Sequence, residues 1–210
     1  MKKILSSLCM VSVSLLFFSC QKSDLSDLAI DNESNSNLSI GQEYQGGIIF
    51  YLDETKKHGL IAAKEDLGPA AWGCYGTSIP GAQSMEDGFT NTKAILANCN
   101  EPGIAARLCD EYVVKEKGAN GKIYDDWFLP SFYQLLHIGV GANGAYGICS
   151  KQYMVSTEAY GAFYGILINE ANSTWAPGIS CSNNNTVISN INYTTRPKTI
   201  SALVRPIRGF

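Results

Sequence analysis

The sequence predicts a single α+β domain, and three observations carry that prediction. Short apolar runs bounded by glycine and polar residues, at 48–52 and 60–63, are typical of β-strands. Two segments, 87–99 and 101–116, carry apolar residues at helical spacing. The second half is rich in glycine and asparagine and contains several short apolar runs, which favours strands joined by long loops.

The first 19 residues have the features of a bacterial lipoprotein signal peptide. Lys2 and Lys3 precede a serine-interrupted apolar stretch, and the stretch closes with a Ser-Cys pair that resembles a lipobox. The stretch is too short and too rich in serine for a membrane span. We therefore expect Cys20 to carry a lipid anchor, while an ordinary cleaved signal with an incidental cysteine is the alternative.

Residues 20–40 are predicted to form a flexible tether, because this serine- and asparagine-rich segment has too little apolar surface to fold. Residues 21–24 resemble the surface-export signals of Bacteroidetes lipoproteins, which implies the outer membrane, and in particular the cell surface, as the location. The folded domain is then 41–210, a normal size for one core.

The first half of this domain is expected to start with a hairpin, in which 48–52 and 60–63 are the strands and 53–59 is the turn. A glycine- and proline-rich loop follows at 67–82, and Trp72 is expected to anchor it. The helix at 87–99 is expected to be capped by Thr90 or Asn91 and to turn Ala94 and Ile95 inward.

The stretch "DDWFLPSFYQLLHIG", residues 125–139, is predicted to be a buried extended segment, a corner and a helix. Pro130 keeps the residue before it out of the helical region. Ser131 and Gln134 have the spacing of a capping box, in which each side chain satisfies a free backbone donor at the helix start. Gly139 is expected to end the helix.

The second half is expected to be mostly strand and loop. Strands are predicted at 152–157, 162–169 and 200–210, with long polar loops at 139–147 and 172–186. Pro206 favours an edge position or the end of the last strand.

The charges exclude a nucleic-acid-binding surface. The chain has 16 basic and 19 acidic residues. Lys2, Lys3, Lys22 and four acids lie before the domain, which leaves 13 basic against 15 acidic residues in 41–210. The one cationic cluster is near the C-terminus, and a strand with outward-facing basic side chains would account for it: Arg196, Lys198, Arg205 and Arg208.

Five cysteines remain once Cys9 and Cys20 are set aside, so an exported domain would leave one of them unpaired. Cys109 is the candidate, because it lies on the predicted inner face of the helix at 101–116 with Ala105 and Val113. The other four allow three connectivities, of which we expect Cys74–Cys99 and Cys149–Cys181. No C-x-x-C motif is present, and the two histidines, His58 and His137, do not form a ligand set, so neither a metal nor another cofactor is expected.

Several segments resemble, in order, the Lcl C-terminal domain family and the related major paralogous domain family. They are "GGIIFYLD…HGLIAA", "WGCYG", "PGIAARLC", "DDWFLPSFYQL", "YMVSTE" and "VRPIRGF", which together span the whole predicted domain. The resemblance implies a C-type-lectin-like fold with a small antiparallel sheet, two to three helices, paired N- and C-terminal strands and long loops. It also implies an adhesion or binding role at the cell surface. A calcium site of the lectin kind is not expected, because Glu101-Pro102-Gly103 lacks the asparagine of the lectin loop.

The sequence thus predicts a lipid-anchored binding module that recognises a glycan or an extracellular protein through its second-half loops. Aromatic faces and amide side chains suit sugar recognition, and the candidate ligand-binding residues are Tyr146, Trp175, Asn183, Asn184 and Asn185. A structural subunit of a surface or fimbrial assembly is the alternative. An enzyme is not expected, because neither Cys109 nor Cys149, the cysteines that would have to act with His137, has a local activating motif.

Overall fold

The computed structural model describes residues 37–117, 121–141, 151–159, 162–168, 179–182, 185–188 and 194–210. Side chains are described for 37–117, 121–138, 151–158 and 197–210. The chain from Asn37 to Phe210 is one compact unit of mixed helix and strand, and the α+β prediction is therefore confirmed. The predicted signal peptide and most of the predicted tether lie outside the described residues.

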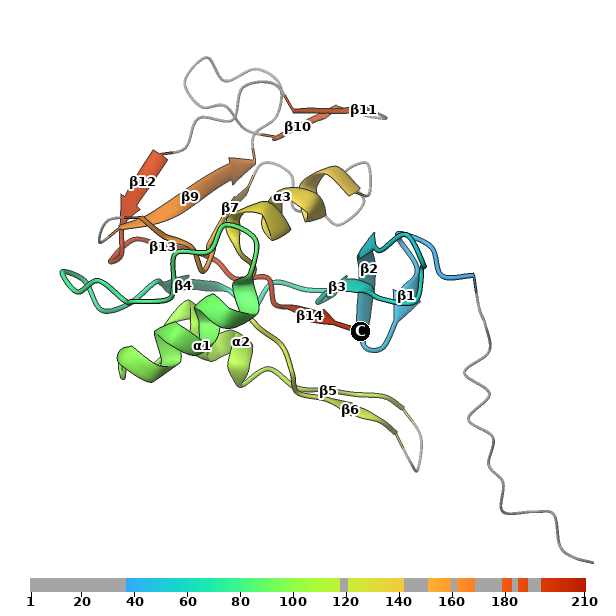
Figure 1. Ribbon diagram of the computed structural model, residues 1–210, viewed down its shortest axis with the longest axis horizontal. Coiled ribbons are helices and arrows are strands. Elements are labelled where there is room, and N and C mark those ends of the chain that lie inside the picture. Colours follow the sequence, from blue (N-terminus) through green and yellow to red (C-terminus); the bar gives the residue numbers. More distant parts are fainter. Residues whose placement is uncertain are drawn as a thin grey trace, which may run out of the picture. The chain divides into compact units, whose positions relative to one another are not determined.

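The first sheet joins the start of the domain to its end (Figure 1). Its antiparallel strands, in spatial order, are β1 (Glu43–Tyr44), β2 (Gly47–Leu52), β3 (Gly59–Ala62) and β14 (Ile207–Gly209). The predicted hairpin is confirmed as β2 and β3. The C-terminal strand pairs with β3, so both ends of the domain share one sheet.

The second sheet collects strands from distant parts of the sequence. Its order is β12 (Thr194–Pro197), β9 (Ala162–Ile168), β7 (Lys151–Tyr153), β13 (Ser201–Leu203) and β4 (Pro69–Ala71), and β8 (Glu158–Ala159) also pairs with β9. The strand β4 lies inside the segment that we predicted to be loop, although the adjacent Trp72 is buried and anchors the segment as expected.

The predicted closing strand at 200–210 is two strands, β13 and β14, one in each sheet. Between them the chain is held by single backbone hydrogen bonds. The Val204 carbonyl accepts a hydrogen bond from the Leu67 N–H, and the Val204 N–H donates one to the Gly68 carbonyl. The Pro206 carbonyl accepts a hydrogen bond from the Ala63 N–H. Proline has no N–H to donate to a ladder, so Pro206 lies where one ladder has ended and the next has not begun.

Two separate hairpins complete the strands. They are β5 (Val114–Lys115) with β6 (Ile123–Tyr124), and β10 (Ile179–Ser182) with β11 (Asn185–Ile188). The hairpin of β5 and β6 shortens the helix predicted at 101–116. Val113 and Val114 are β-branched and favour strand, and Val114 pairs with Tyr124 instead of continuing the helix.

The helices are α1 (Gly88–Asn98), α2 (Ala105–Asp110) and α3 (Phe132–Gly141). The expected cap of α1 was wrong: Asp87 is the N-cap, and its side chain accepts from the Thr90 N–H. Because α2 ends at Asp110, Val113 is 54% exposed, although Ala105 and Cys109 are buried as predicted. The helix α3 also runs two residues past the expected end at Gly139.

The capping box at the start of α3 is confirmed. Gln134 donates its backbone N–H to Ser131 Oγ at 3.4 Å, and Ser131 donates its own to Gln134 Oε1 at 2.9 Å. The same Oε1 accepts from the N–H of Gly88, the first residue of α1, at 3.0 Å. A Cβ on Gly88 would lie 2.5 Å from that oxygen, so this close approach of α1 to the corner requires glycine.

Three hydrophobic clusters fill the domain. The first lies between β2, β3 and α3 and includes Phe50, Phe132 and Leu135. The second joins α1 and α2 to β4 and β13 and includes Trp72, Ile95 and Cys109. The third covers the other face of the first sheet with Ile49, Ile61 and Trp127. The first sheet is therefore buried on both faces, which explains its continuous apolar run.

Candidate functional site

The candidate site is an open groove between the β2–β3 hairpin and α3. The helix α3 packs against β2 (Figure 1). The groove has a volume of about 450 Å³. Its described lining consists of two tyrosines, a leucine, a glutamate, a glutamine and a histidine: Tyr51, Leu60, Glu86, Tyr133, Gln134 and His137. We call it the tyrosine groove.

A β-bulge turns Tyr51 into this groove. The pairing of β2 with β3 shifts between Ile49 and Tyr51, so Phe50 is the extra residue and Tyr51 lies opposite Leu60. Cross-strand partners share one face of a sheet, and both Phe50 and Leu60 pack on the α3 side. Regular alternation would have placed Tyr51 on the opposite face with Ile49. Instead its ring centroid lies 5.8 Å from that of His137, and bulges commonly re-aim side chains in this way near binding sites.

The helix α3 supplies the opposite wall. Tyr133 and His137 are four residues apart, which places them on one side of the helix. Gln134 lies between them with its Oε1 fixed by the N–H groups of Ser131 and Gly88. Its Nε2 has no hydrogen-bond partner among the described residues, so the amide can donate to a molecule in the groove.

The lining suits a polar molecule that has apolar faces. Tyr51 is 42% exposed and Tyr133 is 39% exposed, so parts of both rings are open to solvent. Tyrosine offers an apolar ring and a hydroxyl that both donates and accepts. Glu86 adds an accepting carboxylate and Gln134 a donating amide, while none of the six described lining residues is Lys or Arg.

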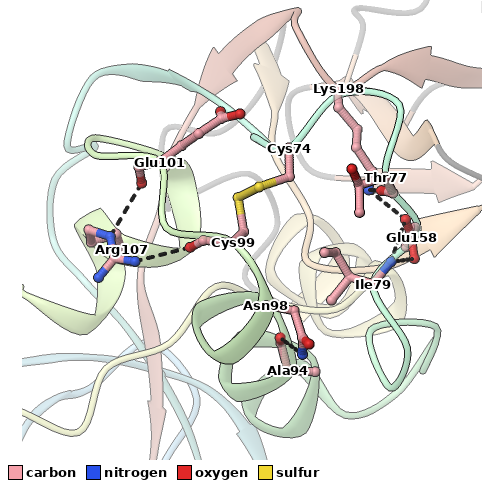
Figure 2. The surroundings of a disulfide bond; sticks show 10 residues. All are labelled: Cys74, Thr77, Ile79, Ala94, Asn98, Cys99, Glu101, Arg107, Glu158 and Lys198. Carbon is pink, nitrogen blue, oxygen red and sulfur yellow. Dashed lines mark hydrogen bonds and ion pairs between the residues drawn. A yellow bond between two sulfur atoms is a disulfide. The ribbon is translucent and has the colours of Figure 1, made fainter.

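The C-terminal basic residues do not face outward, and that expectation was wrong for the three whose side chains are described. Lys198 and Glu158 form an ion pair at 2.5 Å, and their side chains are 0% and 1% exposed. Glu158 also accepts from the Ile79 N–H, and Lys198 donates to the Thr77 carbonyl and lies 4.0 Å from the centre of the Trp72 ring. Figure 2 shows the pair beside Thr77 and Ile79, so it connects the loop after Trp72 to the second sheet.

The side chains of Arg205 and Arg208 are also largely buried and paired, although Asp126, the partner of Arg208, is 52% exposed. Arg205 pairs with Asp66 at 2.7 Å, and Arg208 forms a two-pronged pair with Asp126. Burial raises the pKa of Asp66, but the hydrogen bond and charge of Arg205, with those of Lys151, lower it more, so the pKa lies below its usual range. In these three ion pairs the C-terminal cations are bound to carboxylates within the domain. The side chain of Arg196, the fourth member of the predicted cluster, lies outside the described side chains.

The predicted disulfide Cys74–Cys99 is confirmed, with an S–S distance of 2.11 Å, and Cys109 is buried and unpaired as expected. Glu101 has a carboxylate oxygen near the two sulfur atoms (Figure 2). This is the one group of three metal-ligating residue types within the described part of the chain. Its sulfur atoms are bonded to each other, however, so they are not thiolate ligands.

A second hollow, of about 600 Å³, lies between the β1–β2 turn and β5. Its charged lining is balanced, with three glutamates and three lysines: Glu43, Glu65, Glu116, Lys64, Lys115 and Lys117. Glu43 and Lys64 pair with each other, and Glu116 accepts from the Tyr124 hydroxyl. Because these groups partly satisfy one another and its aromatic residues are less open, this hollow is the weaker candidate.

None of the ligand-binding residues predicted from the sequence has a described side chain. Tyr146, Trp175, Asn183 and Asn184 lie outside the described residues, and Asn185 begins β11 without a described side chain. The same holds for the second predicted disulfide, because Cys149 is outside the described residues and Cys181 is placed only as part of β10. The hairpin of β10 and β11 does lie next to α3, so two strands of the predicted binding region neighbour the helix that supplies one wall of the groove.

The sequence contained the groove residues but no pattern that joins them. Tyr51 lies within an apolar run that is typical of an ordinary strand, and Tyr133 lies in the predicted helix after the Pro130 corner. The tyrosine four residues before His137 was the one local signal available. The bulge that brings Tyr51 to this helix depends on the pairing with β3, which the sequence of β2 alone does not specify.

A scan against protein-family models finds no match to this chain, and a search of curated proteins finds no match either. Among the helices in the described part of the chain, none is long and apolar enough to cross a membrane.

Proposed function

We propose that this chain is a cell-surface binding module that recognises a glycan through the tyrosine groove. The observation that carries the proposal is a pair of partly exposed tyrosine rings, one from β2 and one from α3, on the two walls of an open groove. Sugars present apolar C–H faces that stack on such rings, and their hydroxyl groups bond to carboxylates and amides such as those of Glu86 and Gln134.

The proposal extends to the location and the finer fold class. A lipid at Cys20 would hold the domain at the outer membrane, and the predicted tether between Cys20 and the domain would give the groove reach. Fractionation of Cys20→Ala cells tests this anchor. We also propose a C-type-lectin-like fold within the observed α+β class. The C-terminal strand β14 lies in one sheet with β2 and β3 from the start of the domain, and this pairing supports the proposal. Comparison of a solved structure of the domain with that fold would test it.

Two other classes have less support. A structural subunit completed by a partner strand needs a long free strand edge. The sheet edges in the described part of the chain are short: β1 has 2 residues, β4 and β14 have 3 and β12 has 4. An enzyme with a cysteine nucleophile is also not favoured at Cys109, because burial, with a smaller effect of Asp110, raises the pKa of this thiol.

Alanine variants of the two groove tyrosines test the proposal. We expect the full chain, solubilised in mild detergent, to bind a set of neutral oligosaccharides on a glycan array. Tyr51→Ala and Tyr133→Ala should each weaken that binding by about fivefold or more, because a ring stacked on its ligand is worth about 1 kcal/mol or more. Urea unfolding should show that both variants keep their fold.

The matched control is Tyr75→Ala, which removes a tyrosine that is 66% exposed and outside the groove. It should bind as the parent does. Equal losses for all three variants, or no loss for any of them, would show that the groove is not the binding site.

A further inference from the structure

We infer that the tyrosine groove selects uncharged glycans and discriminates against acidic ones, such as sialylated or sulfated chains. This inference rests on the proposed function and adds the chemical class of the ligand. It follows from the charges that the groove and its neighbouring segments can bring to a bound molecule.

The described lining contains a carboxylate and no basic side chain other than His137. That carboxylate belongs to Glu86, which is exposed. A carboxylate or sulfate on a ligand would meet like charge there. It would also lose water without gaining the arginine or lysine that normally compensates such a group.

The second-half strands that contact α3 add no cation. Besides β2, this helix contacts β9, β10 and β11, which all fall within residues 152–195. That entire stretch contains no Lys or Arg. The nearest basic residue before it, Lys151, is paired with Asp66. These three strands therefore bring no basic side chain to the groove.

The turn between β2 and β3, which follows the strand that carries Tyr51, has balanced charges. It holds Asp53 and Glu54 against Lys56 and Lys57. The Asp53 carboxylate accepts hydrogen bonds from the Thr55 hydroxyl and from two backbone N–H groups of its own turn. This turn therefore provides no net positive charge to offset Glu86.

The test uses a glycan array in which each neutral oligosaccharide is printed beside its sialylated and its sulfated form. The full chain in mild detergent should bind neutral members about fivefold or more tightly than their acidic partners, since like charges about 4 Å apart in water repel by that factor. Glu86→Gln should narrow the difference by strengthening binding to the acidic members. The difference should also shrink in about 1 M salt, where charges are screened beyond about 3 Å.

Glu54→Gln is the matched control, because it removes an acid of the adjacent turn that does not line the groove. It should leave the ratio of neutral to acidic binding unchanged. If acidic members bind the parent as tightly as neutral ones, or if Glu86→Gln leaves the ratio unchanged, the inference is wrong while glycan binding stands. If no glycan binds at all, both the inference and the proposed function are wrong.

Discussion

At the scale of single residues, the fold depends on cations that are buried and paired. Lys198 lies with Glu158 in a site from which water is excluded, and each group has further hydrogen-bond partners. A buried ion pair adds little net stability when it is complete, but removing one partner leaves an uncompensated charge. Its effect is therefore clearest when only one member is changed.

Lys198→Met should lower the free energy of unfolding by about 3–5 kcal/mol, because the Glu158 carboxylate would remain buried without its cation. Urea unfolding followed by circular dichroism measures this change. Lys151→Met is the matched control: Lys151 is 45% exposed and pairs with Asp66 at 3.2 Å. An exposed pair of this kind contributes at most about 1 kcal/mol.

The double variant Lys198→Met/Glu158→Gln should recover part of the stability lost in Lys198→Met, because it removes the unpaired charge. Equal stability of Lys198→Met and Lys151→Met would contradict the role given to the buried pair.

At the scale of elements, the corner Leu129-Pro130-Ser131 connects pieces that are far apart in the chain. Thr92 of α1 bonds through its hydroxyl to the backbone of Leu129, and Gly88 donates to Gln134 at the start of α3. On the other side, Ser156 donates its backbone N–H and its hydroxyl to the Pro130 carbonyl. The capped start of α3, and with it the wall that carries Tyr133, is therefore fixed by both the α1 side and the strand side.

Ser131→Ala should lower the free energy of unfolding by about 1 kcal/mol, the usual cost of losing an N-cap side chain. The denaturant midpoint should fall while the slope stays unchanged, because the surface exposed on unfolding is the same. Ser201→Ala is the control, since Ser201 is exposed in β13, and it should change stability by no more than about 0.5 kcal/mol. A variant at 131 that is as stable as the one at 201 would show that the box does not stabilise the helix.

At the scale of the whole molecule, what could be predicted from sequence was local. The hairpin of β2 and β3, the helix α1 and the capping box follow from short apolar runs bounded by turn residues, from helical spacing and from a side-chain pair three residues apart. The strand β4 could not be predicted, because Pro69–Ala71 becomes a strand only by pairing with β13 more than a hundred residues later. The groove has the same origin: its two walls are distant in sequence, and a bulge decides which face Tyr51 takes.

The number of disulfides in the whole chain can be measured by counting its free thiols. Cys74 and Cys99 are bonded to each other, and Cys109 is fully buried in the second core cluster. Burial, and to a smaller degree the charge of Asp110, raises the pKa of the Cys109 thiol. The folded chain should therefore react with almost no iodoacetamide at pH 8, because the thiolate is the nucleophile.

Unfolding in guanidinium without reductant should expose one reactive thiol per mature chain, and peptide mapping should place it at Cys109. This number depends on the predicted lipid at Cys20 and on the predicted bridge between Cys149 and Cys181. Three labelled cysteines, at 109, 149 and 181, would reject that bridge but keep the assignment of Cys109. Labelling at Cys74 or Cys99 without reductant would contradict the disulfide that joins the loop after Trp72 to the end of α1. The variant Cys109→Ala identifies the free thiol directly, because it should remove all labelling of the unfolded chain.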